Sequence, residues 1–325
     1  MPGTKSRVQG ASGGYLVRTN AAGFRSDREF RLERDPGVFR ALLFGDSQTA
    51  GDGTANALRY SDLLEASVPG LEVNNYAVSG SATDQQYLTY QDHADTPHDL
   101  VVIGLYVENI RRITRRIVQA RDASGAEVFR AKPYFELNQG DLTLHNIPVP
   151  KHAWTDATLP NELRPHVYSY GEANYFFRRQ SRQHETVMRL FARLGPLRSV
   201  AKRVLTRFRK FQPLPDYDSC DTPGWSLLRA ILKTWIAESR TPVLLVPLPH
   251  DSSLAGLSDP ANYQARFREI ADETSCYLYD PLPALLQLSL VERQTLWSDS
   301  YGHLSVHGHA AIARLLVPVL ERLRG

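Results

Sequence analysis

The chain has 325 residues, of which 42% are hydrophobic and 22% are charged, and its net charge is +3. This composition is ordinary for a globular protein, the length favours one domain with a sizeable insertion, and the small charge gives no reason to expect a nucleic-acid partner. We expect a cytoplasmic protein, because no stretch has the roughly 20 apolar residues of a transmembrane helix and the N-terminus lacks the apolar core of a secretory signal.

From Phe39 onward, short apolar runs alternate with longer amphipathic stretches, which is typical of strands that cross over to helices in a parallel sheet. The predicted strands are Phe39–Phe44, Leu71–Val78, Leu100–Tyr106, Val243–Val246 and Tyr277–Tyr279. The predicted helices are Ser61–Ala66, Asp84–Tyr90, Trp225–Ile236, Tyr263–Thr274 and Gly308–Leu323. We therefore expect a three-layer α/β/α sandwich with a central parallel sheet, in which ligands bind at the carboxyl ends of the strands.

The alternation is interrupted at about residues 121–223. Here Tyr134–Leu137 and Leu142–Leu144 flank Asn138–Asp141, which predicts a β-hairpin with a four-residue loop. We interpret 1–325 as one domain and this interval as an inserted hairpin and helical region that caps the active edge of the sheet.

The insertion also contains a basic stretch, residues 178–210, with eleven Lys or Arg residues and Glu185 as its single acidic residue. Apolar residues recur within it at helical spacing, so a solvated face of an amphipathic helix accounts for the pattern. An anionic substrate, a phosphopantetheine carrier protein or an acidic membrane surface would account for it as well.

The strongest local signal is an apolar strand that ends abruptly in Gly45-Asp46-Ser47. A serine at the carboxyl end of a strand can act as a nucleophile if a base and oxyanion donors lie nearby. A Gly-Asp-Ser turn by itself is also a common way to begin a helix, so a plain helix cap stays open at this point.

Three further segments match the same pattern. The stretch Asn20–Arg25 precedes the nucleophile strand, Asn75–Gln85 follows the next strand, and Trp297–His309 precedes the last amphipathic stretch. With Gly104–Ile110 after the third strand, they resemble the sequence blocks of the SGNH, or GDSL-type, esterase and acyltransferase family. The resemblance covers most of the chain apart from parts of the insertion.

The resemblance implies an oxyanion hole made by the backbone N–H groups of Ser47 and Gly80 and by an asparagine side chain. The family's Asn-Asp pair appears here as Glu108-Asn109. We choose Asn109 as the donor, because a carboxylate would repel an oxyanion. Gly80 also suits a tight turn, and Asn109 also suits the start of a helix.

The same resemblance makes His303 the general base, a role that suits an imidazole with an ordinary pKa near ~6.5. Asp299 is the expected acid of the triad, although it precedes the histidine by four residues instead of the family's usual three. A backbone carbonyl is the alternative partner of the imidazole. His309 aligns with a second family histidine that caps or packs the last helix, and His307 has no assigned role.

The function implied is hydrolysis of an O-acyl ester, with an acetyl or other short acyl group on a sugar or related small molecule. A biosynthetic acyltransferase with the same acyl-enzyme, and a non-catalytic binding module on the same fold, are the alternatives. We expect neither a cofactor nor a metal, since the two cysteines, Cys220 and Cys276, lack the number and spacing of a metal or redox site.

Overall fold

A computed structural model describes residues 2–10, 13–168, 212–298 and 302–325. At its centre is a five-stranded parallel sheet of β3 (Phe39–Gly45), β4 (Leu71–Asn75), β5 (Leu100–Tyr106), β12 (Val243–Leu248) and β13 (Tyr277–Leu278). Every predicted strand is present, and the second one ends three residues earlier than expected.

The strand order is β13-β12-β5-β3-β4. The chain thus builds from β3 outward to β4, returns to β5 on the other side of β3, and then continues to the opposite edge. The winding direction reverses between β3 and β5, and the carboxyl ends at such a reversal leave a crevice where ligands bind in doubly wound folds. The site is therefore to be sought just after Gly45 and Tyr106.

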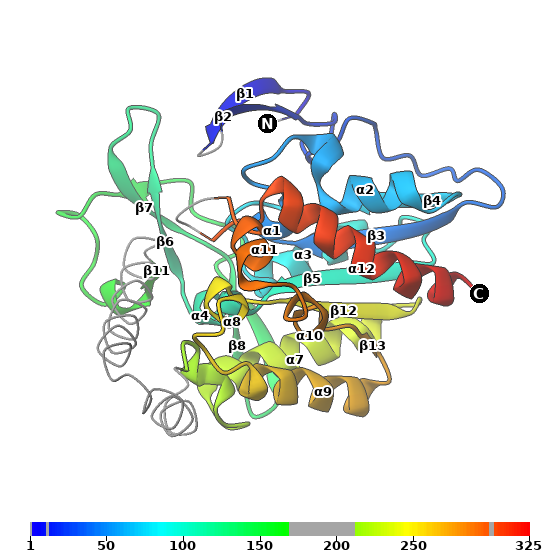
Figure 1. The fold of residues 1–325 in the computed structure, drawn as a ribbon. Coiled ribbons are helices and arrows are strands. Elements are labelled where there is room, and N and C mark those ends of the chain that lie inside the picture. The colour runs from blue at the N-terminus through cyan, green and yellow to red at the C-terminus, as the bar shows by residue number, and fades with distance from the viewer. Residues whose placement is uncertain (1, 11–12, 169–211, 299–301) are drawn as a thin grey trace, which may run out of the picture.

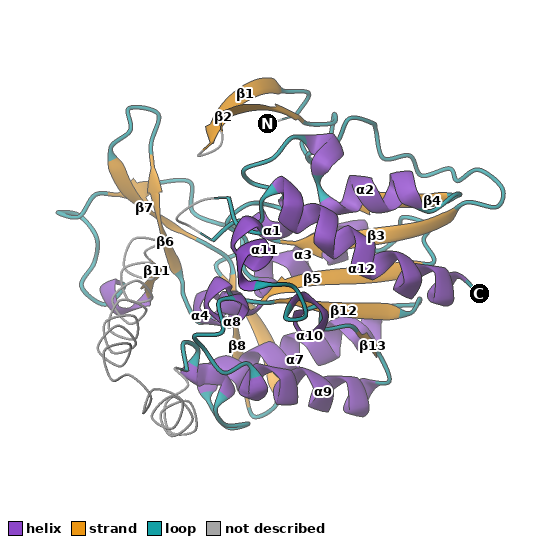
Figure 2. Cartoon of the chain, in the orientation of Figure 1, coloured by secondary structure: helices purple, strands orange, loops and turns teal. Residues whose placement is uncertain are grey.

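Helices cover both faces of the sheet, so the molecule has the expected three layers (Figures 1 and 2). On one face α2 (Tyr60–Ser67) packs against α12 (Val306–Arg324). On the other, α7 (Pro223–Glu238) lies between α3 (Thr83–His93) and α9 (Ala261–Thr274). The strands β3, β5 and β12 are buried almost along their whole length, because their apolar side chains pack against the helices on both faces of the sheet.

The described residues also form several short helices and 3-10 turns. They are α1 (Ser47–Ala50), η1 (Asn56–Leu58), η2 (Val107–Asn109), α4 (Ile110–Ile113), η3 (Arg164–His166), η5 (Pro215–Tyr217), α8 (Asp251–Leu254), α10 (Leu282–Leu285) and α11 (Leu290–Thr295). A hairpin that the sequence did not signal, β1 (Lys5–Gly10) and β2 (Gly13–Arg18), precedes the sheet.

Between α4 and residue 168 the chain forms two small sheets. One contains β6 (Ile117–Arg121), β7 (Glu127–Ala131), β10 (Ala153–Trp154) and β11 (Val167–Tyr168), and the other is the hairpin of β8 (Tyr134–Asn138) and β9 (Asp141–His145). The predicted hairpin is present, but its four-residue loop is wrong. Asn138 pairs with Asp141, which leaves a two-residue turn of Gln139 and Gly140 with φ values of 52° and 99°. Two positive φ values are typical of the type I′ turn that suits the twist of a hairpin.

Two buried contacts join these small sheets to the carboxyl edge of the central sheet. Lys132, which follows β7, forms an ion pair with Asp84 in the first turn of α3. The hydroxyl of Tyr168 in β11 donates to the carboxylate of Glu108, just after β5, at 2.8 Å. The described part of the interval thus contacts the edge of the sheet where the predicted site residues lie.

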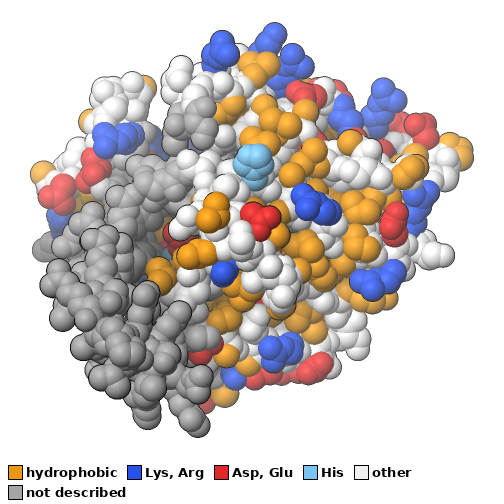
Figure 3. Space-filling model, in the orientation of Figure 1, with side chains coloured by type: hydrophobic (Ala, Val, Ile, Leu, Met, Phe, Trp, Pro, Cys, Tyr) orange, Lys and Arg blue, Asp and Glu red, His pale blue; other side chains and the backbone are white. Residues whose placement is uncertain are grey.

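The surface of the described residues carries acidic and basic side chains interspersed on the face seen in Figure 3. The basic stretch at 178–210 lies outside the described residues. None of the helices in the described ranges combines the length and the hydropathy that a membrane span requires.

Candidate active site

Ser47 is the first residue of α1 and stands two positions after Gly45, the last residue of β3. Asp46 occupies the N-cap, where its side chain accepts a hydrogen bond from the N–H of Gln48 at 3.0 Å. The capping role that the sequence left open for Ser47 therefore belongs to Asp46. Ser47 is 7% exposed, so its hydroxyl is available only within a confined space.

His303 lies in the loop between α11 and α12, and its Nε2 is 3.1 Å from Oγ of Ser47. The two residues are 256 positions apart in the chain. The distance is that of a hydrogen bond through which the imidazole can take the serine proton. His307 and His309 follow at the start of α12, where His307 is exposed and His309 is buried.

His309 packs within the fold. Its Nδ1 accepts a hydrogen bond from the N–H of Tyr60 at 3.2 Å, and its ring stacks on the Tyr60 ring with 5.9 Å between the two ring centres. Burial, together with the charges of Arg59 and Arg25, lowers the pKa of His309 to about 3. The ring is therefore neutral at physiological pH and holds the start of α2 against α12.

Asp46 is fully buried beneath the serine. Burial raises the pKa of its carboxyl to about 6, while the nearby Arg112, the Gln48 N–H, His303 and Asn109 act in the opposite direction. Asp46 thus lies close to Arg112, which follows β5, and to His303 in the loop before α12.

Asn109 is fully buried at the end of η2, next to Asp46. By hydrogen-bond geometry, neither its amide nitrogen nor its amide oxygen has a partner within the described residues, although the amide lies close enough to the Asp46 carboxylate to lower the pKa of that carboxyl. Its side chain does not cap α4, although the residue stands at the N-cap position. A buried amide without a partner costs free energy, so an acceptor atom of a bound molecule would stabilise it.

Glu108, the alternative at this position, has a different environment. Its carboxylate forms an ion pair with Arg112 at 2.9 Å and accepts the hydrogen bond from Tyr168. The Arg112 guanidinium also lies over the Tyr168 ring, 5.2 Å from its centre. These contacts make Glu108 part of a buried ionic cluster, which sequence reasoning missed because Tyr168 is 60 positions away.

Gly80 lies in the turn that joins β4 to α3, and its φ of 80° is in the region that favours glycine. The turn is fastened to the end of β3, since the N–H of Val78 and the hydroxyl of Ser81 both bond the carbonyl of Gly45, at 3.1 and 3.2 Å. The segment Asn75–Gln85 therefore contacts Gly45, the residue two positions before Ser47.

The segment Asn20–Arg25 contacts the end of the short helix that begins with Ser47. Arg25 is buried, and its guanidinium bonds the carbonyls of Ala50 and Gly51 at 3.0 and 2.6 Å, at the end of α1. It also bonds Asn56 Oδ1 at 2.8 Å. One side chain thus fixes the short helix that begins with Ser47.

Asp299 lies outside the described residues, so its relation to His303 stays a prediction. Within the described ranges, no group of three or more His, Cys, Asp or Glu residues could hold a metal ion.

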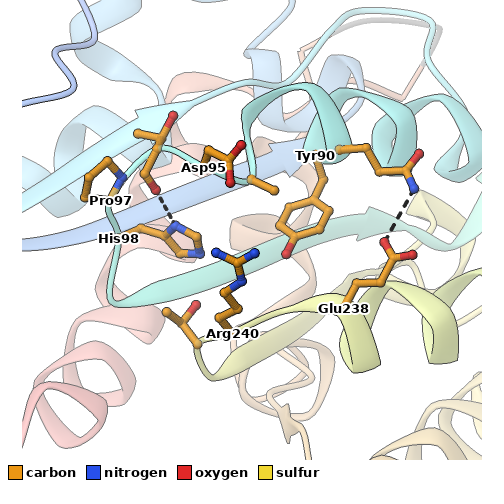
Figure 4. A pocket seen from close by; sticks show the side chains of 10 residues that line it. Tyr90, Asp95, Pro97, His98, Glu238 and Arg240 are labelled. Atoms are coloured by element: carbon orange, nitrogen blue, oxygen red, sulfur yellow. Dashed lines mark hydrogen bonds between the residues drawn. The ribbon is translucent and has the colours of Figure 1, made fainter.

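One cavity, of about 430 Å³, lies at the opposite edge of the sheet (Figure 4). Tyr90, Asp95, His98, Glu238 and Arg240 are among its lining residues, close to the amino ends of β5 and β12. Its walls include none of the predicted site residues, so it is separate from the serine–histidine pair.

At the carboxyl edge, the chain therefore combines a confined serine, an imidazole within hydrogen-bond distance of it, and a buried asparagine without a partner. Such a set can transfer an acyl group through the serine oxygen and stabilise the oxyanion that forms.

Comparison with protein-family models finds no match. Comparison with curated proteins finds none either. Among solved structures, a member of the lipolytic protein G-D-S-L family from Veillonella parvula is 12% identical, with a TM-score of 0.45, over 88% of this chain and 100% of that one. A lipase/acylhydrolase from Enterococcus faecalis is 13% identical, with a TM-score of 0.44, over 88% of this chain and 96% of that one.

An acetylxylan esterase from Geobacillus stearothermophilus is 16% identical, with a TM-score of 0.43, over 89% of this chain and 95% of that one. All three likenesses are distant. The function proposed below therefore rests on the geometry of this chain.

Proposed function

We propose that the protein is a serine hydrolase of the SGNH type that removes a short O-acyl group from a small molecule. The observation that carries the proposal is the 3.1 Å contact between Ser47 Oγ and His303 Nε2, at the carboxyl edge where the sheet reverses its winding. The short acyl group is the one that the resemblance to the SGNH family implies.

In the proposed mechanism, His303 takes the proton of Ser47 as Oγ attacks the acyl carbon. The oxyanion of the tetrahedral intermediate accepts hydrogen bonds from the N–H groups of Ser47 and Gly80 and from the Asn109 amide. The imidazolium then protonates the leaving alcohol, and an acyl-enzyme remains. Water, deprotonated by His303, attacks this ester and releases the acid and the free serine.

Asp299 is proposed to accept a hydrogen bond from the other nitrogen of His303, which would fix the tautomer and stabilise the imidazolium. The buried, unpartnered amide of Asn109 supports its role as the oxyanion donor. Glu108 does not compete for this role, because Arg112 and Tyr168 already hold its carboxylate.

The test is labelling of the intact protein with a fluorophosphonate probe, followed by peptide mapping and by hydrolysis assays with acetyl and longer-chain p-nitrophenyl esters. We expect the label on Ser47 and the highest kcat/KM for the acetyl ester. Ser47→Ala should lose both label and turnover with an unchanged circular dichroism spectrum. His303→Ala should be nearly as inactive, a loss of about 10⁴-fold or more.

His307→Ala is the matched control, since this exposed histidine at the start of α12, four residues after His303, should tolerate the change. A folded wild-type protein that takes no label would contradict the proposal and favour the non-catalytic binding module. Product analysis with and without an added sugar acceptor separates hydrolysis from acyl transfer.

A further inference from the structure

Gln48, the residue after the nucleophile, makes two hydrogen bonds to the loop that carries the base. Its side-chain Nε2 donates to the carbonyl of Gly302 at 2.6 Å, and its Oε1 accepts from the N–H of Leu304 at 3.0 Å. These two partners flank His303 on either side. The side chain is 1% exposed, so water does not compete for the bonds.

The Gln48 side chain bonds the backbone on both sides of His303 as the backbone of a neighbouring strand would. In an extended segment, the carbonyl of one residue and the N–H two residues later point to the same edge, where a neighbouring strand would bond them. The Gln48 amide supplies one donor and one acceptor to this edge. On the other edge, the carbonyl of His303 accepts from the N–H of Ser298 at 2.8 Å, and Trp297 bridges Leu304.

The backbone of Gln48 is itself fixed, because its N–H donates to the buried carboxylate of Asp46 at 3.0 Å. A continuous chain of short bonds therefore runs from the cap of α1, through Gln48, to both peptide groups beside His303. Since Ser47 and Gln48 are adjacent, the same turn sets the positions of the serine and of the histidine loop.

We propose that Gln48 is a positioning residue that holds His303 in register with Ser47, an inference that rests on the proposed serine-hydrolase function. Only an amide of this length offers both the donor and the acceptor. A carboxylate would keep the bond from Leu304 but repel the carbonyl of Gly302, and a thioether would lose both bonds. A displacement of the imidazole of about 1 Å costs on the order of 10²-fold in rate.

The experiment compares Gln48→Met and Gln48→Glu with Gln86→Met. Gln86 is a matched control, since it is 2% exposed and its amide has no partner within the described residues. We expect both Gln48 variants to lower kcat about 10²-fold with KM within a few-fold of wild type, and Gln86→Met to leave kcat within a few-fold. If Gln48→Met does not fold, Gln48→Glu decides, because it keeps the shape and one bond.

A second readout separates positioning from general loss of stability. In the His303→Ala background, Gln48→Met should lower the residual activity no further, because its effect passes through the imidazole. An equal further loss in that background, or a wild-type kcat in Gln48→Glu, would overturn the proposal.

A third readout needs no activity. Amide hydrogen exchange of Leu304 should be faster in Gln48→Met than in wild type and unchanged in Gln86→Met. If wild type takes no label at Ser47 while exchange at Leu304 responds as expected, the proposed function fails and the contact stands. If wild type is labelled and active but Leu304 exchanges at the same rate in Gln48→Met as in wild type, the positioning role of Gln48 is wrong and the proposed function stands.

Discussion

Asn109 and Glu108 are neighbours in the chain with opposite surroundings. The Glu108 carboxylate has two buried partners, whereas the Asn109 amide has none within the described residues. Removing a partner of a buried ion pair typically costs about 3–5 kcal/mol, while removing a group that makes no hydrogen bond costs little. The two positions therefore separate catalysis from stability.

We predict that Asn109→Ala lowers kcat by about 10²-fold or more, the scale of a lost oxyanion donor, with the free energy of unfolding changed by less than about 1 kcal/mol. Glu108→Ala should instead lower the free energy of unfolding by several kcal/mol, because the buried Arg112 loses its ion pair at 2.9 Å. Ester hydrolysis and urea unfolding measure the two effects. A full-activity Asn109→Ala would remove this residue from the oxyanion hole.

At the scale of elements, the position of Ser47, the proposed nucleophile, depends on a helix of only four residues, Ser47–Ala50. A helix this short is not stable by itself, so its position must come from tertiary contacts. Arg25 provides such contacts, since its guanidinium group donates hydrogen bonds to carbonyls at the end of α1 and to the side chain of Asn56. This gives a physical reason for an arginine in the Asn20–Arg25 segment.

We predict that Arg25→Lys destabilises the protein by about 2 kcal/mol or more and lowers kcat, because a lysine keeps the charge but cannot reach the same set of acceptors. Urea unfolding and ester hydrolysis are the measurements. Arg18→Lys is the control, since its ion pair with Asp27 is 3.6 Å long and nearly half exposed, so the change should be small. Equal stability of Arg25→Lys and wild type would mean that charge alone holds α1.

At the scale of the whole molecule, stability depends on pH through buried groups. His309 has an ordinary pKa of 6.5 when unfolded and about 3 when folded. Between these values the unfolded chain binds a proton that the folded protein does not, so stability falls as the pH decreases. Asp46 acts in the opposite direction, because its pKa rises on folding from 3.8 to about 6 and its burial as a carboxylate costs stability as the pH increases.

We predict that the free energy of unfolding of wild type loses about 2.5 kcal/mol from His309 alone between pH 7 and pH 4.5. In His309→Asn this contribution disappears, so the difference in stability between the variant and wild type should narrow as the pH falls. Chemical unfolding at several pH values measures it. His307→Asn, at an exposed histidine, should leave the pH dependence unchanged. A constant difference between His309→Asn and wild type would contradict the assignment.

The sequence by itself determined the five strands and the main helices, because apolar alternation and helical periodicity are local properties that burial in a sheet preserves. It also placed Ser47 at a strand end and His303 in the loop before the last helix. The sequence did not predict the early end of β4 or the two-residue hairpin turn, because the pairing register of neighbouring strands decides where a strand ends.

Only the tertiary structure decided which distant groups meet. The bonds from Gln48 to the histidine loop span 254 and 256 positions, and the contact of Tyr168 with Glu108 spans 60. No local pattern marks such partners, because a glutamine, a glutamate or a tyrosine has the same propensities whether its polar group faces water or a buried acceptor. Packing decides which groups pair, because it removes water from them and leaves only the protein partners within reach.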